Sequence, residues 1–124
     1  MDNVYEKLFD EKLFDETIEV GDIISQNAIN NKVYKSCNYK KDRIIGVCTN
    51  VNNNEITISN SGCVDVNIIG IACIGDKVTC SDIPGKGVAI RYDQDETIFN
   101  IRSIGKIIGL YDNYDKVKIL LDIE

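Results

Sequence analysis

The sequence predicts an all-β protein: a small barrel or sandwich of about ten short strands with an internal pseudo-duplication, plus a short N-terminal arm or helix. Three observations carry this prediction. The strand-favouring residues Ile, Val and Thr are abundant from Thr17 onward. Turn residues recur roughly every 8–12 positions, the spacing typical of sandwiches and barrels. After residue 20, apolar residues do not repeat with the period of a helix.

We expect a single β domain over residues 17–124, preceded by an arm over residues 1–16. The arm repeats EKLFD, and its apolar side chains are too many to stay solvated in a short isolated segment. A helix of one or two turns and an extended arm fit this stretch equally well. Packing on the arm's own chain and contact with another subunit both remain open. The candidate subunit contacts are Tyr5, Leu8, Phe9, Leu13 and Phe14.

Turn residues separate the expected strands. Gly21–Asp22 and Gly75–Asp76 each begin one, because Gly permits positive φ and Asp caps a turn. Asn52–Asn54 lies between two short apolar runs and predicts a hairpin. Pro84 lies in a loop, where the missing N–H is tolerated. The expected strands span roughly residues 22–26, 32–37, 43–49, 55–59, 63–73, 77–80, 87–91, 97–101, 105–111 and 116–123.

The two halves of the chain resemble each other. Residues 21–25 (GDIIS) resemble residues 75–79 (GDKVT), and residues 43–47 (RIIGV) resemble residues 106–110 (KIIGL). Each half then ends in an alternating strand, which we place at residues 64–68 and at residues 117–121. A Gly inside an Ile-rich strand marks a bulge or a close backbone approach, and such bends let a sheet close on itself. Chance similarity between Ile-rich strands is the alternative.

Composition excludes several function classes. The net charge of −6 argues against nucleic-acid binding, because a polyanion needs a basic face. The chain has no His, which excludes Ser-His-Asp and Cys-His catalysis and His-ligated zinc. No apolar run approaches the roughly 20 residues that a membrane helix needs, and the N-terminus is too polar for a signal peptide. We therefore expect no nucleic-acid partner and no membrane partner.

The five cysteines favour reduced, structural thiols. Their number is odd, none forms a CxxC pair, and most stand in apolar, strand-like contexts where a free Cys behaves as a small hydrophobe. The implied compartment is a reducing cytosol. A disulfide and a reactive thiol remain the alternatives. The cysteines are Cys37, Cys48, Cys63, Cys73 and Cys80.

An ordered set of segments resembles a β-domain of phage tail fibres, tailspikes and related virion proteins, commonly found at the C-terminal end of longer chains. That pattern has an acidic aromatic lead-in, a GD-strand, a charged turn with an IGV-strand, a second GD-strand with a serine-containing loop ending in PG, and a closing strand of the type GK-x-(I/L)-G. Here these segments are Tyr5–Phe9, Glu19–Ser25, Lys41–Val47, Gly75–Ala89 and Ile104–Leu110.

The resemblance implies a non-catalytic structural or assembly module of a bacteriophage or prophage-derived particle, such as a tail fibre, spike or decoration-type component. It implies a homo-oligomer, with a trimer favoured because fibres and spikes are usually three-fold, and other particle proteins as partners. The chain would reside in the cytoplasm of a bacterial host during assembly and then in the particle. Abundant Ile, Asn and Lys indicate an AT-rich genome, such as that of a low-GC Gram-positive host. No cofactor and no metal site are expected.

Two alternatives remain. One is a receptor- or carbohydrate-binding tip, for which Tyr92, Tyr111 and Tyr114 stand in polar contexts. The other is a self-cleaving domain like those at the ends of some spikes, since such chemistry needs a nucleophile and an activating partner. The candidate residues for it are Cys80, Ser81, Lys77 and Lys86, although turn capping is the simpler role for Ser81. The acidic stretch Asp93–Glu96 lacks the glycine and distal Glu of a calcium loop, so we expect a solvated turn.

Overall fold

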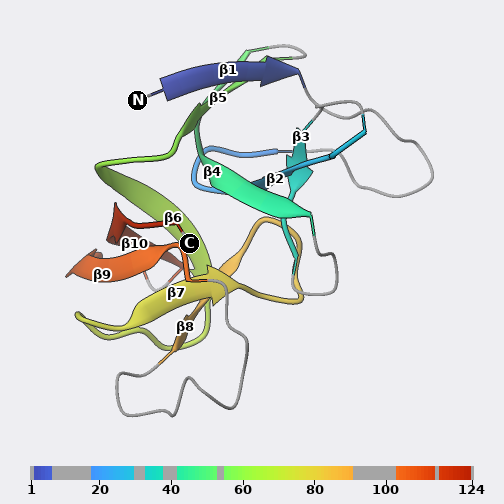
Figure 1. Cartoon of the computed structure of the whole chain (residues 1–124). Helices are drawn as coiled ribbons and strands as arrows, with labels where there is room; N and C mark the ends of the chain where they lie inside the picture. The colour runs from blue at the N-terminus through green and yellow to red at the C-terminus, as the bar shows by residue number, and fades with distance from the viewer. Residues whose placement is uncertain are drawn as a thin grey trace.

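The described residues form ten strands and no helix, which confirms the predicted all-β class. The first five strands in the chain form one sheet, and the last five form a closed barrel (Figure 1). The two halves follow one another along the chain without exchanging strands. The computed structural model describes residues 2–6, 18–29, 33–37, 42–52, 55–90, 103–113 and 115–123.

The sheet of the first half is antiparallel at every described pairing, and its strands do not lie in chain order. The N-terminal strand pairs with the last strand of this half rather than with its neighbour in sequence. In spatial order the strands are β1 (Asp2–Glu6), β5 (Glu55–Ser59), β4 (Arg43–Asn52), β2 (Ile23–Gln26) and β3 (Val33–Lys35).

The second half has the equivalent strand order, β6-β10-β9-β7-β8, and its two end strands pair to close a barrel. Its closing contact is parallel, from β6 to β8, whereas its other pairings are antiparallel. In spatial order the strands are β10 (Lys116–Leu121), β6 (Cys63–Ile69), β8 (Gly87–Ile90), β7 (Lys77–Cys80) and β9 (Gly105–Leu110).

Several of the sequence-based boundaries change; for example, the strand expected over residues 43–49 continues to Asn52. The strand expected over residues 63–73 ends at Ile69, because Gly70 turns the chain with a φ of +79°. In the segment expected to be a helix or an extended arm, residues 2–6 form strand β1, which pairs with β5 of its own chain. The strand expected over residues 97–101 lies outside the described residues.

Adjacent residues on β2 enter two different cores. Ile23 and Ile24 are both fully buried, and neighbouring side chains on a strand point to opposite faces. Ile23 therefore packs in the barrel core and Ile24 in the core of the first sheet. The barrel core also takes Ile44 and Val47 from β4, so a single apolar cluster joins the two halves.

The predicted duplication of the GD turns is confirmed in detail. Gly21 and Gly75 have φ values of +96° and +95°. The carboxylates of Asp22 and Asp76 each accept a hydrogen bond from the backbone N–H three residues earlier, at 2.9 and 3.0 Å. Each turn then leads into the strand that the sequence predicts, β2 or β7.

The second repeated glycine is Gly105, not Gly109 as the sequence comparison has it. A Cβ atom on Gly46 would lie 2.3 Å from the Ser59 carbonyl oxygen, and one on Gly105 would lie 2.2 Å from that of Leu120. These glycines therefore occupy equivalent places beside β5 and β10. The sequence contains Ile-Gly twice in this region, and only the strand register distinguishes the two copies.

The closing strands also correspond differently from the sequence comparison. Residues 64–68 belong to β6, which pairs with β10 rather than being its counterpart. Because β6 lies against β10 as β1 lies against β5, the equivalent pairs are β1 with β6 and β5 with β10. The alternation of apolar residues is shared by all strands with one buried face, so it does not identify a counterpart.

Substituting Ala at Gly46 or at Gly105 should destabilise the protein by at least about 3 kcal/mol or prevent folding, because backbone atoms cannot move away as a flexible side chain can. The control is Gly62→Ala, which meets nothing within 4 Å and whose φ of +82° costs about 1–2 kcal/mol. Urea unfolding of the three variants measures the difference. Equal losses at Gly46 and Gly62 would contradict the close approach.

Candidate functional site

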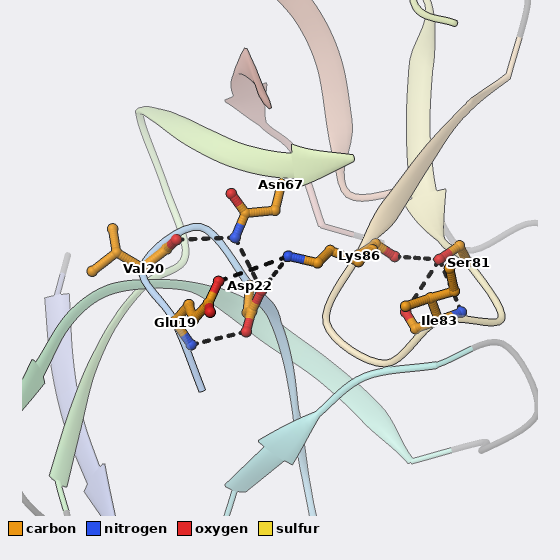
Figure 2. Close-up of polar contacts among 7 residues, drawn as sticks. All are labelled: Glu19, Val20, Asp22, Asn67, Ser81, Ile83 and Lys86. Atoms are coloured by element: carbon orange, nitrogen blue, oxygen red, sulfur yellow. Dashed lines mark hydrogen bonds and ion pairs between the residues drawn. The ribbon is translucent and has the colours of Figure 1, made fainter. Parts of the chain in front are cut away.

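A cluster of polar side chains lies where the two halves meet (Figure 2). Glu19 and Asp22 come from the segment that leads into β2, Asn67 comes from β6, and Lys86 comes from the loop before β8. The sequence separation between Asp22 and Asn67 is 45 residues, so only the packing of the halves brings them together.

Asp22 is the centre of this cluster and is 2% exposed. One carboxylate oxygen accepts a hydrogen bond from the Glu19 backbone N–H at 2.9 Å. The other accepts one from the Asn67 side-chain amide at 3.0 Å and lies 3.8 Å from the Lys86 ammonium. Buried carboxylates are costly unless such partners are present, and here they come from both halves.

Glycine is required on both sides of the cluster. A Cβ atom on Gly21 would lie 2.7 Å from the Asn67 side-chain oxygen, and one on Gly85 would lie 2.8 Å from the Asp22 carboxyl carbon. The Asn67 backbone N–H also donates to the Gly21 carbonyl at 2.9 Å. The halves therefore approach each other at backbone distance, which positions Asn67 and Asp22 for their hydrogen bond.

Burial raises the pKa of Asp22 above its ordinary value of 3.8. The hydrogen bonds from Glu19 and Asn67 and the positive charges of Lys86 and Lys35 act in the opposite direction but do not cancel the loss of solvation. A carboxyl with a raised pKa next to a cation also occurs at sites of acid–base chemistry. Here one carboxylate oxygen caps the turn of its own half, and the other accepts the hydrogen bond from Asn67 that joins the two halves.

A groove of about 590 Å³ runs beside the cluster, lined by Lys86, Asn67 and Tyr111 among others. It adjoins a more apolar groove of about 340 Å³, which also contains Tyr111 and is lined by Ile71 and Leu110. The Tyr111 hydroxyl donates to an Asp65 carboxylate oxygen at 2.5 Å, and this hydrogen bond raises the pKa of Tyr111. Of the three tyrosines that the sequence suggests for carbohydrate binding, Tyr111 is the one that lies among the described residues. Its side chain lines both grooves.

The proposed nucleophile Ser81 is held within its own loop. Its hydroxyl accepts a hydrogen bond from the Ile83 N–H at 3.1 Å and lies 2.8 Å from the Lys86 carbonyl oxygen, to which it donates (Figure 2). The Lys86 ammonium points instead to Asp22 and to Glu19, at 3.8 and 3.9 Å. Cys80 is buried in the barrel core. The structure therefore gives Ser81 the turn-capping role, and the Lys86 ammonium pairs with carboxylates rather than with Ser81.

The other sequence-predicted candidates are only partly described. Tyr5 lies opposite Ile56 in the backbone pairing of β1 with β5. The remaining candidates lie outside the described residues: Leu8, Phe9, Leu13, Phe14, Tyr92, Tyr114 and the acidic stretch 93–96.

Sequence reasoning missed Asn67 as a functional residue. Its position in an alternating strand indicated only one face of a sheet. The sequence did contain one signal for Asn67: it is a polar residue among apolar neighbours that predict burial. Asn67 is indeed only 7% exposed. A buried amide requires partners, and the sequence did not show which ones.

All five cysteines are free, as the sequence predicts. Three are buried and two are exposed, so the thiols divide into two groups. No group of three or more Cys, Asp or Glu residues that could hold a metal ion occurs in the described part of the chain. That part also contains no helix with the length and hydrophobicity needed to span a membrane.

The chain matches no protein-family model, no curated protein and no solved structure. The resemblance to phage tail-fibre and tailspike domains therefore stays a prediction from the sequence motifs.

Replacing Asp22 by Asn should change how stability depends on pH. Because the pKa of Asp22 is raised on folding, this carboxyl holds more of its proton in the native than in the unfolded chain between pH 3.8 and its folded pKa. This carboxyl contributes stability that is present below pH 3.8 and is lost as the pH rises through the folded pKa. We expect the unfolding free energy of wild type minus that of Asp22→Asn to fall from about pH 4 toward neutrality.

Urea unfolding at a series of pH values measures this difference. Lys86→Met is the companion variant: the Lys86 charge lowers the pKa of Asp22, so its removal should move the decline to higher pH. A difference that rises with pH would contradict a raised pKa for Asp22.

Thiol titration of the native protein should show two accessible groups, Cys63 and Cys73, and three more after denaturation. Burial slows the reaction of Cys37, Cys48 and Cys80 because the reagent must wait for an opening of the structure. Recovery of fewer than five thiols from denatured, unreduced protein would indicate a disulfide and contradict the free state.

Proposed function

We propose that this chain is a non-catalytic structural or assembly module of a phage or prophage-derived particle. The observation that carries the assembly role is an apolar end of the barrel. There Ile71, Ile74 and Leu110 are 82%, 65% and 50% exposed. Ile71 and Leu110 line the same groove. Clustered apolar side chains at the surface of a folded domain mark contact sites.

The roles of the polar side chains Ser81 and Asp22 support the same proposal. The hydroxyl of Ser81 and the carboxylate of Asp22 both hold backbone segments in place. A role in maintaining the fold explains both side chains without a reaction. The finer statement, that the particle is a phage tail fibre, spike or decoration-type component built from trimers, rests on the sequence resemblance.

A binding tip is the second candidate function, and Tyr111 is the observation that favours it. This side chain is 39% exposed and lies at the wall of a groove that also contains Asn113 and Lys116. Aromatic rings beside polar groups suit sugar recognition. Glycan binding that is lost in Tyr111→Ala, with the subunit count unchanged, would favour this candidate.

Light scattering of the full chain at high micromolar concentration tests the proposed function. We expect an oligomer, with three subunits as the first expectation, because exposed apolar groups are buried on association. The intact mass of the same sample should equal that of the uncleaved chain. A monomer would remove the main support for assembly, and a shortened chain that Ser81→Ala restores to full length would support self-cleavage instead.

A further inference from the structure

The barrel of the second half opens into the apolar groove at one of its ends, where β6 and β9 finish and β10 begins. The groove has a volume of about 340 Å³, and its lining includes Ile68 and Val117 of the barrel core. Leu110 pairs with Val117 across the strands, so its side chain lies on the same inner face. Barrel mouths often hold binding sites, and this volume lies within their range of about 300–1,000 Å³. We call it the barrel-mouth groove.

Apolar side chains at the barrel-mouth groove are in contact with water. Ile71 is almost fully exposed and Leu110 is half-exposed, although both line the groove. Covering such side chains removes apolar surface from water and stabilises the contact. The barrel-mouth groove is therefore suited to an aromatic or leucine side chain from a partner.

One positive charge accompanies this apolar lining. Among the described residues that line the barrel-mouth groove, Lys116 is the only charged one. Its ammonium forms no ion pair or hydrogen bond with a described residue. The carboxylates of Glu19 and Asp115 line the more polar groove beside it instead. Since complementary charges fix the register of a contact, the matching partner has a carboxylate next to its apolar side chain.

The chain itself contains this combination twice. Residues 6–15 read EKLFDEKLFD, so each Leu-Phe pair is followed directly by an Asp. We call residues 6–15 the repeat segment. Its four apolar residues are among those that the sequence predicts as subunit contacts. Residues 7–15 lie outside the described part of the chain, and their chemistry is read from the sequence.

Both flanks of the repeat segment belong to the first half of the chain. Before it, β1 pairs with β5, and after it Ile18 is buried in the core of the first sheet. The barrel-mouth groove belongs to the second half. A second copy of the chain can present its segment to this groove with both flanks in place.

We propose that the barrel-mouth groove binds the repeat segment of a second copy of this chain. A Phe side chain of the segment occupies the apolar groove beside Ile71 and Leu110, and the Asp that follows it lies at Lys116. Groove and segment are different surfaces of one chain, so the contact is heterologous. Such contacts form closed rings when the rotation between subunits permits, and a ring of three is a trimer.

This inference rests on the proposed assembly function and names its contact. Light scattering over a concentration series compares wild type with Ile71→Glu and with the double variant Phe9→Ser/Phe14→Ser. Each should weaken association by at least about tenfold, because a charge is desolvated in the contact or its apolar anchor is lost. The matched control is Ile29→Glu, the same change at an exposed position of the first half, which should associate like wild type.

Mixing the two defective variants distinguishes docking between chains from docking within one chain. Phe9→Ser/Phe14→Ser retains an intact groove, and Ile71→Glu retains an intact segment. We expect the mixture to form dimers with one chain of each kind at concentrations where neither variant associates alone. A mixture that stays monomeric throughout the series overturns the proposal. A Phe9→Ser/Phe14→Ser protein that melts at lower temperature with its subunit count unchanged also overturns it, because the segment then packs on its own chain.

Exchanging the charges provides a second test. Lys116→Glu should weaken association because its carboxylate repels the Asp of the segment, and Asp10→Lys/Asp15→Lys should weaken it through repulsion from Lys116. The chain that combines all three changes should recover association. Association of the combined chain that is no stronger than that of Lys116→Glu overturns the pairing of the segment with Lys116.

The outcomes separate this inference from the proposed function. An oligomeric wild type together with an Ile71→Glu protein that associates equally well overturns the barrel-mouth contact and leaves assembly standing. Equal dissociation of Ile71→Glu and Ile29→Glu does the same, because the effect is then not specific to the groove. A monomeric wild type overturns assembly itself, and this inference with it.

Discussion

The carboxylate of Asp22 is buried at the meeting point of the two halves, and the arrangement of the molecule depends on its partners. Its two oxygens take hydrogen bonds from the turn that precedes β2 and from the amide of Asn67 in the other half. Burial opposes the charge, so these donors and the Lys86 ammonium must all be in place. This requirement fixes the relative position of the halves more specifically than the shared apolar core does, because apolar contacts are not directional.

The two halves share the same glycine turns and strand order, but the first forms an open sheet and the second a closed barrel. Each has an Asp-capped glycine turn and a glycine pressed against the carbonyl oxygen of the neighbouring strand, at Gly46 and at Gly105. Both halves then show a register shift along the strand pair that follows. In the second half the parallel pairing of β6 with β8 closes the barrel.

The side chain of Ser81, which the sequence suggests as a catalytic candidate, forms hydrogen bonds to the backbone of its own loop. Ser81 bridges the two sides of its loop, and its counterpart Asn27 makes the same turn in the first half. That repetition explains Ser81 by conformation, because Ser and Asn both favour such turns. The exposed side chains of Ile71 and Tyr111 are apolar and aromatic, and such groups are suited to contacts with other molecules.

The sequence by itself determined the strand content, the paired GD turns and the free thiols, because each is set by local chemistry: β-branched residues, glycine at positive φ, and an odd cysteine count without close pairs. Only the tertiary structure decided that Gly105 rather than Gly109 is the counterpart of Gly46, and that β1 is the counterpart of β6. It also decided that Asn67 meets Asp22 across 45 residues. Register and long-range pairing depend on the simultaneous packing of both faces of every strand, and a periodic pattern of apolar residues is the same for every register that buries the same face.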